Sequence, residues 1–246
     1  MPPAPQPLPP ESRTVGQLVA ETLRLYGRRF WVALPLGLAF AVVNQFRDES
    51  PGAWLVAATV GSVAIALAFA LASALAGATR LGRDTTPAAV AAGVVAFLPP
   101  TLLLRWFILL GLVWLALFAL AVPAAVLERR GFVDALRRGL RLARADYVHV
   151  LGALATLALL YFLTSVMLAV LLREQGDQTE RIAQFLADLV LSPVFLLGGA
   201  LLYYDQEARA RTIRPRTDRR EGERDADLHP PLDPDGTGRA DAQGQP

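Results

Sequence analysis

One acidic residue lies inside an apolar stretch, where charge is costly. Asp188 falls within the apolar run 182–204, about 9 Å along the helix that this run predicts, at a rise of 1.5 Å per residue. An ionisable group at that depth in lipid marks a functional or structural site. We expect Asp188 to pair with Arg105, which the predicted topology puts on the same side of the membrane. The pair would either line a polar pathway or hold two helices together.

A second group of polar residues forms the arginine-rich segment 129–146. At 100° per residue its apolar side chains share one side of a helix, with Leu142 as the exception: Phe132, Val133, Leu136, Leu140 and Ala143. Five arginines on the other side are candidate contacts for lipid head groups: Arg130, Arg137, Arg138, Arg141 and Arg144. This pattern predicts a basic amphipathic helix at the membrane surface. It could anchor the topology, bind specific head groups or dock an acidic cytoplasmic partner.

The sequence shows no grouping with catalytic or metal-binding spacing. There is no cysteine, so disulfides and thiolate chemistry are excluded. His149 is expected to lie at an interface, and the other histidine, His229, is in the polar tail. A Gly-rich phosphate loop with Lys and a GxSxG elbow are both absent. We therefore expect no cofactor, no metal and no enzymatic activity. A membrane-embedded lipid enzyme is the least supported alternative.

Composition indicates a membrane protein. The 246 residues are 54% hydrophobic with a mean hydropathy of +0.39, and several apolar runs approach or exceed the roughly 20 residues that cross a bilayer. All 24 basic residues are arginine, which is typical of a bacterial genome rich in G and C. Nucleic acid is not an expected partner, because the arginines are expected to lie against the membrane and do not alternate with aromatic residues.

The predicted fold is an all-α, polytopic membrane bundle. Six runs are candidate transmembrane helices: 30–46, 54–78, 88–104, 106–127, 147–172 and 182–204. A small-residue stripe in the second run would allow another helix to approach closely: Ser62, Ala66, Ala70, Ala74 and Ala78. An amphipathic helix over 14–28 would begin with the capping box of Thr14 and Gln17. Residues 1–13 and 212–246 are expected to be disordered, the first as a Pro-rich leader.

The number of spans depends on the third run. Pro99-Pro100 interrupts it, so an interfacial helix at 87–97 followed by a broken span would leave five crossings. Arginine placement favours six, because six crossings put 20 arginines on one side and 4 on the other. We therefore predict a bacterial plasma-membrane protein with both termini in the cytoplasm. The first span begins too late for a cleaved signal peptide and is expected to remain as an anchor.

Several segments resemble a known family. The run VPAAVLE at 122–128 and ALRRGLRLAR at 135–144 are similar to the membrane domain associated with glycerophosphoryl diester phosphodiesterases. The opening segment 15–30 and LLYYD at 201–205 also resemble that family, so the likeness covers roughly 14–211. The chain has Gly139-Leu140 where the family often has Ser-Trp. The resemblance implies a membrane module without the phosphodiesterase domain or its activity.

Two functions follow as expectations. The first is a non-enzymatic membrane protein that organises lipid or protein partners: anionic head groups at the cytoplasmic face, and another membrane protein or a second copy of the chain. The second is a transporter or permease-like subunit. Asp188, the proline-broken third run and a discontinuous span near Arg105 favour the second.

Overall fold

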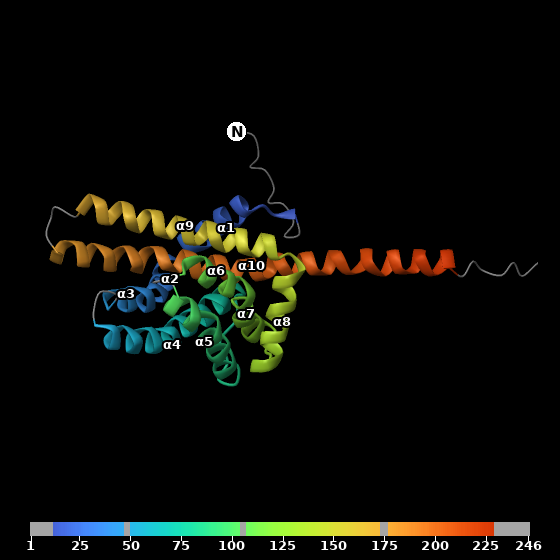
Figure 1. Cartoon of the computed structure of the whole chain (residues 1–246), viewed down its shortest axis with the longest axis horizontal. Helices are drawn as coiled ribbons and strands as arrows, with labels where there is room; N and C mark the ends of the chain where they lie inside the picture. The colour runs from blue at the N-terminus through green and yellow to red at the C-terminus, as the bar shows by residue number, and fades with distance from the viewer. Residues whose placement is uncertain (1–11, 47–49, 104–106, 173–176, 229–246) are drawn as a thin grey trace, which may run out of the picture. The chain divides into compact units, whose positions relative to one another are not determined.

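The computed structural model describes residues 12–46, 50–103, 107–172 and 177–228. These residues are helical apart from short connections, and they contain no strand, which confirms the all-α class. The chain divides into two compact units, Met1–Ala210 and Arg211–Pro246. The helix bundle lies in the first unit (Figure 1). The predicted leader over 1–11 and the tail beyond 228 lie outside the described residues.

The helices follow one another with short connections. The N-terminal part consists of α1 (Val15–Arg28), α2 (Phe30–Ala33), the 3-10 turn η2 (Leu34–Gly37) and α3 (Leu38–Gln45). The central part consists of α4 (Pro51–Ala76), α5 (Thr86–Leu103), α6 (Ile108–Phe118) and α7 (Ala121–Leu127). The C-terminal part consists of α8 (Phe132–Ala145), α9 (Tyr147–Leu172) and α10 (Asp177–Leu228).

Five helical segments in the described chain are long and apolar enough to cross a membrane: Gly52–Ala76, Thr86–Leu103, Ile108–Leu127, Tyr147–Leu172 and Arg181–Thr212. The first predicted span forms a shorter apolar segment, Phe30–Gln45. The 3-10 turn η2 interrupts it, and Pro35 within that turn has no backbone N–H to donate. The chain is thus a membrane protein with five full-length candidate spans and one broken, shorter apolar helix.

The α1 helix begins as its sequence predicts. The Thr14 hydroxyl accepts from the Gln17 N–H, and the Gln17 side chain accepts from the Thr14 N–H, so the capping box is present. Leu18, Thr22 and Tyr26 are buried. The Tyr26 hydroxyl donates to the Val190 carbonyl in α10 at 2.9 Å. One face of α1 therefore packs into the bundle.

The proline pair does not end the third span, because α5 runs unbroken from Thr86 to Leu103 with Pro99 and Pro100 inside it. Pro99 cannot donate to the Val95 carbonyl four residues earlier. The Trp114 indole N–H of α6 donates to that carbonyl instead, at 2.8 Å. A side chain from the neighbouring helix thus satisfies the group that the proline leaves free, and the alternative with a helix ending near 97 is wrong.

The small-residue stripe of α4 forms a close helix contact. Its buried members are Ser62, Ala66, Ala70 and Ala74. A Cβ added to Gly93 of α5 would lie 2.4 Å from the Ala66 Cβ, so the two backbones approach more closely than larger residues allow. The helix ends at Ala76, which leaves Ala78 outside the stripe.

The basic helix forms over Phe132–Ala145, but its buried face differs from the predicted one. Leu142 is 1% exposed, whereas Val133 is 53% exposed. The reason is Gly139, where an added Cβ would lie 2.5 Å from the Ala121 backbone nitrogen of α7. The helix therefore packs through its smallest residue, and this contact turns Leu142 inward and Val133 outward. Periodicity alone could not select this face.

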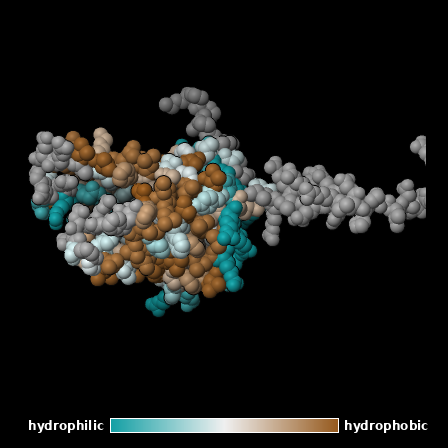
Figure 2. All heavy atoms as spheres, in the orientation of Figure 1, coloured by the Kyte–Doolittle hydropathy of each residue, from teal (hydrophilic) through white to brown (hydrophobic). Residues whose placement is uncertain are grey.

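The last helix extends further than predicted. α10 continues through Leu228, so the expectation of disorder from residue 212 is wrong for 212–228. Extending an existing helix avoids the cost of nucleating a new one, and low apolar content does not prevent this. Figure 2 shows mostly apolar residues over the spans and a hydrophilic strip over α8.

Candidate functional site

Asp188 lies at the contact of three helices and is fully buried. Its Oδ2 accepts from the Asn44 side-chain N–H of α3 at 2.9 Å. Its Oδ1 accepts from the Tyr161 hydroxyl of α9 at 2.5 Å and from the Gln184 amide at 2.9 Å. Asn44 also donates to the Tyr161 oxygen at 3.0 Å. We call these four residues the Asp188 cluster.

The broken first helix passes beside this cluster. A Cβ on Gly37 would lie 2.1 Å from the Leu189 carbonyl oxygen, so only glycine allows η2 to approach α10 this closely. The Ser192 hydroxyl lies 2.6 Å from the Asp188 carbonyl and 3.5 Å from the Gly37 carbonyl. The 3-10 turn and the buried carboxylate are thus neighbours.

The sequence found the carboxylate but not its described partners. Arg105 lies outside the described residues, so its pairing with Asp188 stays a prediction. Asn44, near the end of the first apolar run, donates an interhelical hydrogen bond to Asp188. Gln184 stands four residues before Asp188, a spacing that brings side chains together on a helix. Tyr161 is harder to identify from the sequence, because one tyrosine hydroxyl within an apolar run is only a weak indication of a polar site.

Glu128, at the end of α7, forms a second polar centre. Its carboxylate accepts from Arg130, Arg138 and the Tyr203 hydroxyl, with the Arg138 contact at 2.8 Å. Arg138 also lies 3.5 Å from Glu207. Burial opposes ionisation of Glu128, but hydrogen bonds from the other groups outweigh it and hold the pKa of Glu128 below its ordinary value. We call these five residues the Glu128 network.

This network changes the interpretation of the five candidate lipid contacts. Arg130 and Arg138 form ion pairs inside the protein. Burial would lower the pKa of the Arg138 guanidinium, but its hydrogen bond to Glu128 raises it. Arg137, Arg141 and Arg144 are exposed, and the structure shows no ion pair for these three within the described residues. Only they present their charge outward.

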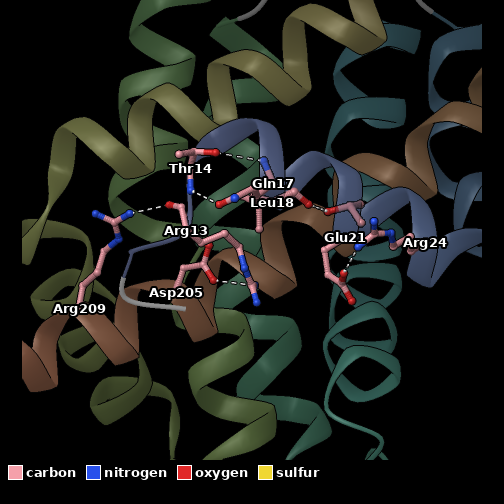
Figure 3. A network of polar contacts seen from close by, with 9 residues as sticks. Arg13, Thr14, Gln17, Leu18, Glu21, Arg24, Asp205 and Arg209 are labelled. Carbon is pink, nitrogen blue, oxygen red and sulfur yellow. Dashed lines mark hydrogen bonds and ion pairs between the residues drawn. The ribbon is translucent and has the colours of Figure 1, made fainter. Parts of the chain in front are cut away.

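A third set of contacts joins Arg13, which lies just before α1, to the last helix (Figure 3). The Arg13 guanidinium donates to Asp205 at 2.9 Å, and Arg209 donates to the Arg13 carbonyl at 2.8 Å. Arg209 also donates to Asp146, between α8 and α9, at 2.8 Å. These contacts join the residue before α1 and the α8–α9 connection to α10.

Contacts bring three arginine-bearing segments to one end of the first unit, which we call the basic end: Arg13 before α1, the segment 128–146, and Arg209 of α10. Arg13 meets Asp205, and the Glu128 network joins α7, α8 and α10. Where α4 ends, a Cβ on Gly77 would lie 2.4 Å from Leu127. In Figure 1, α8 runs across the direction of α9. Away from the basic end, the last residue of α3 meets the start of α10. There the Gln45 amide donates to the Arg181 carbonyl at 3.4 Å.

The carboxylates of Asp188 and Glu128 both join helices through their hydrogen bonds. The described residues contain no group of three or more side chains suited to a metal ion. The Nε2 atom of His149 is buried and has no hydrogen-bond partner in the described chain. A hollow lined by the α4–α5 and α7–α8 connections and a groove between α3 and α4 do not include Asp188 in their lining. Searches against family models, curated proteins and solved structures find no match to the chain.

Proposed function

We propose that this chain is a non-enzymatic, multi-pass membrane protein that organises lipid or protein partners at its basic end. The observation that carries the proposal is the gathering of arginine-rich segments there, with Arg137, Arg141 and Arg144 exposed on α8. Arginines near a membrane surface attract anionic lipid by about 1 kcal/mol per charge. The partners are anionic head groups, and either another membrane protein or a second copy of the chain.

The interior polar groups support an organising role. The Asp188 cluster and the Glu128 network use their donors and acceptors to join helices. Side chains that hold helices together keep a surface in one shape, and a fixed surface can gather partners. The family resemblance, which implies a membrane module without phosphodiesterase activity, agrees with this proposal.

We place the protein in a bacterial plasma membrane with both termini in the cytoplasm. The positive-inside rule supports this orientation, because the arginine-rich segments share one end of the bundle. Reporter domains fused at residue 175 and at the C-terminus test it. We expect the reporter at residue 175 to show that this position lies outside the cytoplasm. The reporter at the C-terminus should show that the C-terminus lies inside it. Activity of both on one side would overturn the proposed orientation.

The experiment that tests the organising role is lipid analysis of the full chain purified from native membranes. We expect anionic lipid to be enriched over the bulk membrane, and the triple change Arg137→Gln, Arg141→Gln, Arg144→Gln to reduce it. The control removes the same charge from the tail, with Arg214, Arg216 and Arg219 changed to Gln. The proposal would be wrong if the bound lipid matched the bulk membrane and neither variant changed it, and if no membrane protein or second copy were bound to the chain.

A transporter or permease-like subunit is the second candidate. One observation favours it: η2 breaks an apolar helix beside the buried Asp188. Discontinuous helices next to ionisable groups are typical of transport sites. Recovery of a nucleotide-binding subunit in stoichiometric amount, or solute flux into liposomes that Asp188→Asn abolishes without unfolding the protein, would favour this function.

A further inference from the structure

A hollow at the basic end lies between two connections far apart in the sequence. It has a volume of about 280 Å³ and is lined by Gly82, Asp84, Thr85, Arg129, Arg130 and Gly131. The first three residues belong to the α4–α5 connection, and the last three link α7 to α8. In Figure 1 the start of α5 lies close to the start of α8.

The lining of the hollow carries charges of both signs. Asp84 and Arg129 are exposed, and no ion pair is found for either residue in the part of the chain that the structure describes. Arg130 gives its Nε–H to Glu128, which leaves the other N–H groups of its guanidinium for another acceptor. One carboxylate and two guanidinium groups therefore line a hollow of about 280 Å³.

We infer that this hollow binds the phosphoethanolamine head group of a membrane lipid. The phosphate would lie against Arg129 and Arg130, since guanidinium groups match phosphate oxygens. The ammonium group would donate hydrogen bonds to Asp84. The Thr85 hydroxyl, 3.0 Å from the Gly82 carbonyl, offers its oxygen to the same ligand.

The inference rests on the proposed function and extends it, because it adds a zwitterionic lipid class to the anionic lipids that the basic end attracts. It differs from general attraction of anionic lipid to α8. Three exposed arginines attract any negative head group, whereas a carboxylate in the same hollow disfavours a purely anionic one. Asp84 is thus the residue that sets the choice of lipid.

Arg129 and Asp84 can be changed separately. Arg129 has φ of 52°, in the left-handed region, and Asn adopts that conformation more readily than most residues. Arg129→Asn therefore removes the guanidinium without disturbing the backbone, and Asp84→Asn removes the carboxylate charge in an exposed loop. Arg137→Gln is the matched control, because it removes one exposed arginine of α8 that does not line the hollow.

The test is native mass spectrometry of the delipidated full chain with phosphatidylethanolamine, phosphatidylcholine or phosphatidylglycerol of identical acyl chains. We expect tightest binding of phosphatidylethanolamine, because methylation removes the N–H donors of choline. Arg129→Asn should weaken it about fivefold, the equivalent of about 1 kcal/mol. Asp84→Asn should abolish the preference over phosphatidylcholine, and Arg137→Gln should leave that preference intact.

Soluble competitors separate the lipid head group from a simple anion. Displacement by O-phosphoethanolamine and not by inorganic phosphate supports the inference, and equal displacement by both overturns it. An unchanged preference in both hollow variants also overturns it but leaves lipid binding in place. A wild-type chain that retains none of the three lipids overturns the inference together with its lipid-organising basis. Should Arg129→Asn fail to fold, Asp84→Asn alone decides.

Discussion

Asp188 and Glu128 are both carboxylates that join helices, yet their described partners differ in kind. Asp188 is fully buried among the spans, and its described side-chain donors are neutral: Asn44, Tyr161 and Gln184. Glu128 is 18% exposed at the end of α7 and is held by two arginines and a tyrosine. At a helix end, the guanidinium groups that hold Glu128 can keep contact with water.

The largest expected effect is that of Asp188→Leu. Asp188 would lose two interhelical hydrogen bonds, from Asn44 and Tyr161, and one from Gln184 within α10. Interhelical hydrogen bonds in membranes contribute about 0.6 to 1.7 kcal/mol each. We expect a loss of about 2–4 kcal/mol, measured by unfolding of the detergent-solubilised protein. Asp188→Asn should lose less, because its amide oxygen still accepts. Normal assembly of the Leu variant with lost activity would show that the carboxylate serves function and not structure.

Glu128→Gln is expected to be next. It leaves Arg130 without its counter-charge and Arg138 with Glu207 alone, and we expect a cost of about 1–3 kcal/mol. The folded pKa of Glu128 is below its ordinary value of 4.5. Its stabilising effect is therefore complete above that value and lost as the pH falls through the folded pKa. Melting temperatures of the wild type and the variant should differ at pH 7 and converge below pH 4.5. A constant difference would contradict the assignment.

Arg138→Gln and Arg137→Gln compare two adjacent arginines of α8. Arg138 is joined to Glu128 and Glu207, and we expect its loss to cost about 1–2 kcal/mol. Arg137 is exposed, and its loss should change the free energy of unfolding by less than about 0.5 kcal/mol. Equal effects in a denaturant titration would mean that the face of α8 is assigned incorrectly.

The two tyrosines should contribute less than the carboxylates that they contact. Tyr161→Phe and Tyr203→Phe each remove one hydroxyl donor from a carboxylate. We expect about 1 kcal/mol for Tyr161 and about half of that for Tyr203, because the arginines at Glu128 compensate. A double-mutant cycle with Asp188→Asn or Glu128→Gln isolates each contact. A larger loss at Tyr203 would reverse the comparison.

The elements that local chemistry decides were predictable from the sequence. The capping box of Thr14 and Gln17 is a four-residue pattern, and α9 has the predicted bounds because a long apolar run between polar residues forms a single helix. The buried face of α8 was not predictable, since it depends on Gly139 meeting Ala121. Sequence patterns describe one helix at a time, whereas this contact belongs to two.

The candidate site was predictable only in part, for the same reason. Asp188 stands out because charge in an apolar run is costly. Its partner Asn44 is 144 residues away, and no local pattern connects the two. Arg130 and Arg138 were assigned to lipid because the helix pattern puts all the arginines on the polar side. The position of Glu128 at the end of α7 brings those two arginines into the protein.

Some contacts of the N-terminal part of the chain can form only after much later residues have been synthesised. Arg13, Tyr26 and Asn44 meet partners that follow them by 192, 164 and 144 residues. A ribosome makes the N-terminal end first, at about 5–20 residues per second. The first helices therefore wait for tens of seconds at the slower rate before their partners emerge. A chain truncated before residue 188 would lack these partners of Arg13 and Tyr26 and would leave Asn44 with Tyr161 alone. We expect premature termination to leave a product that membrane proteases recognise easily.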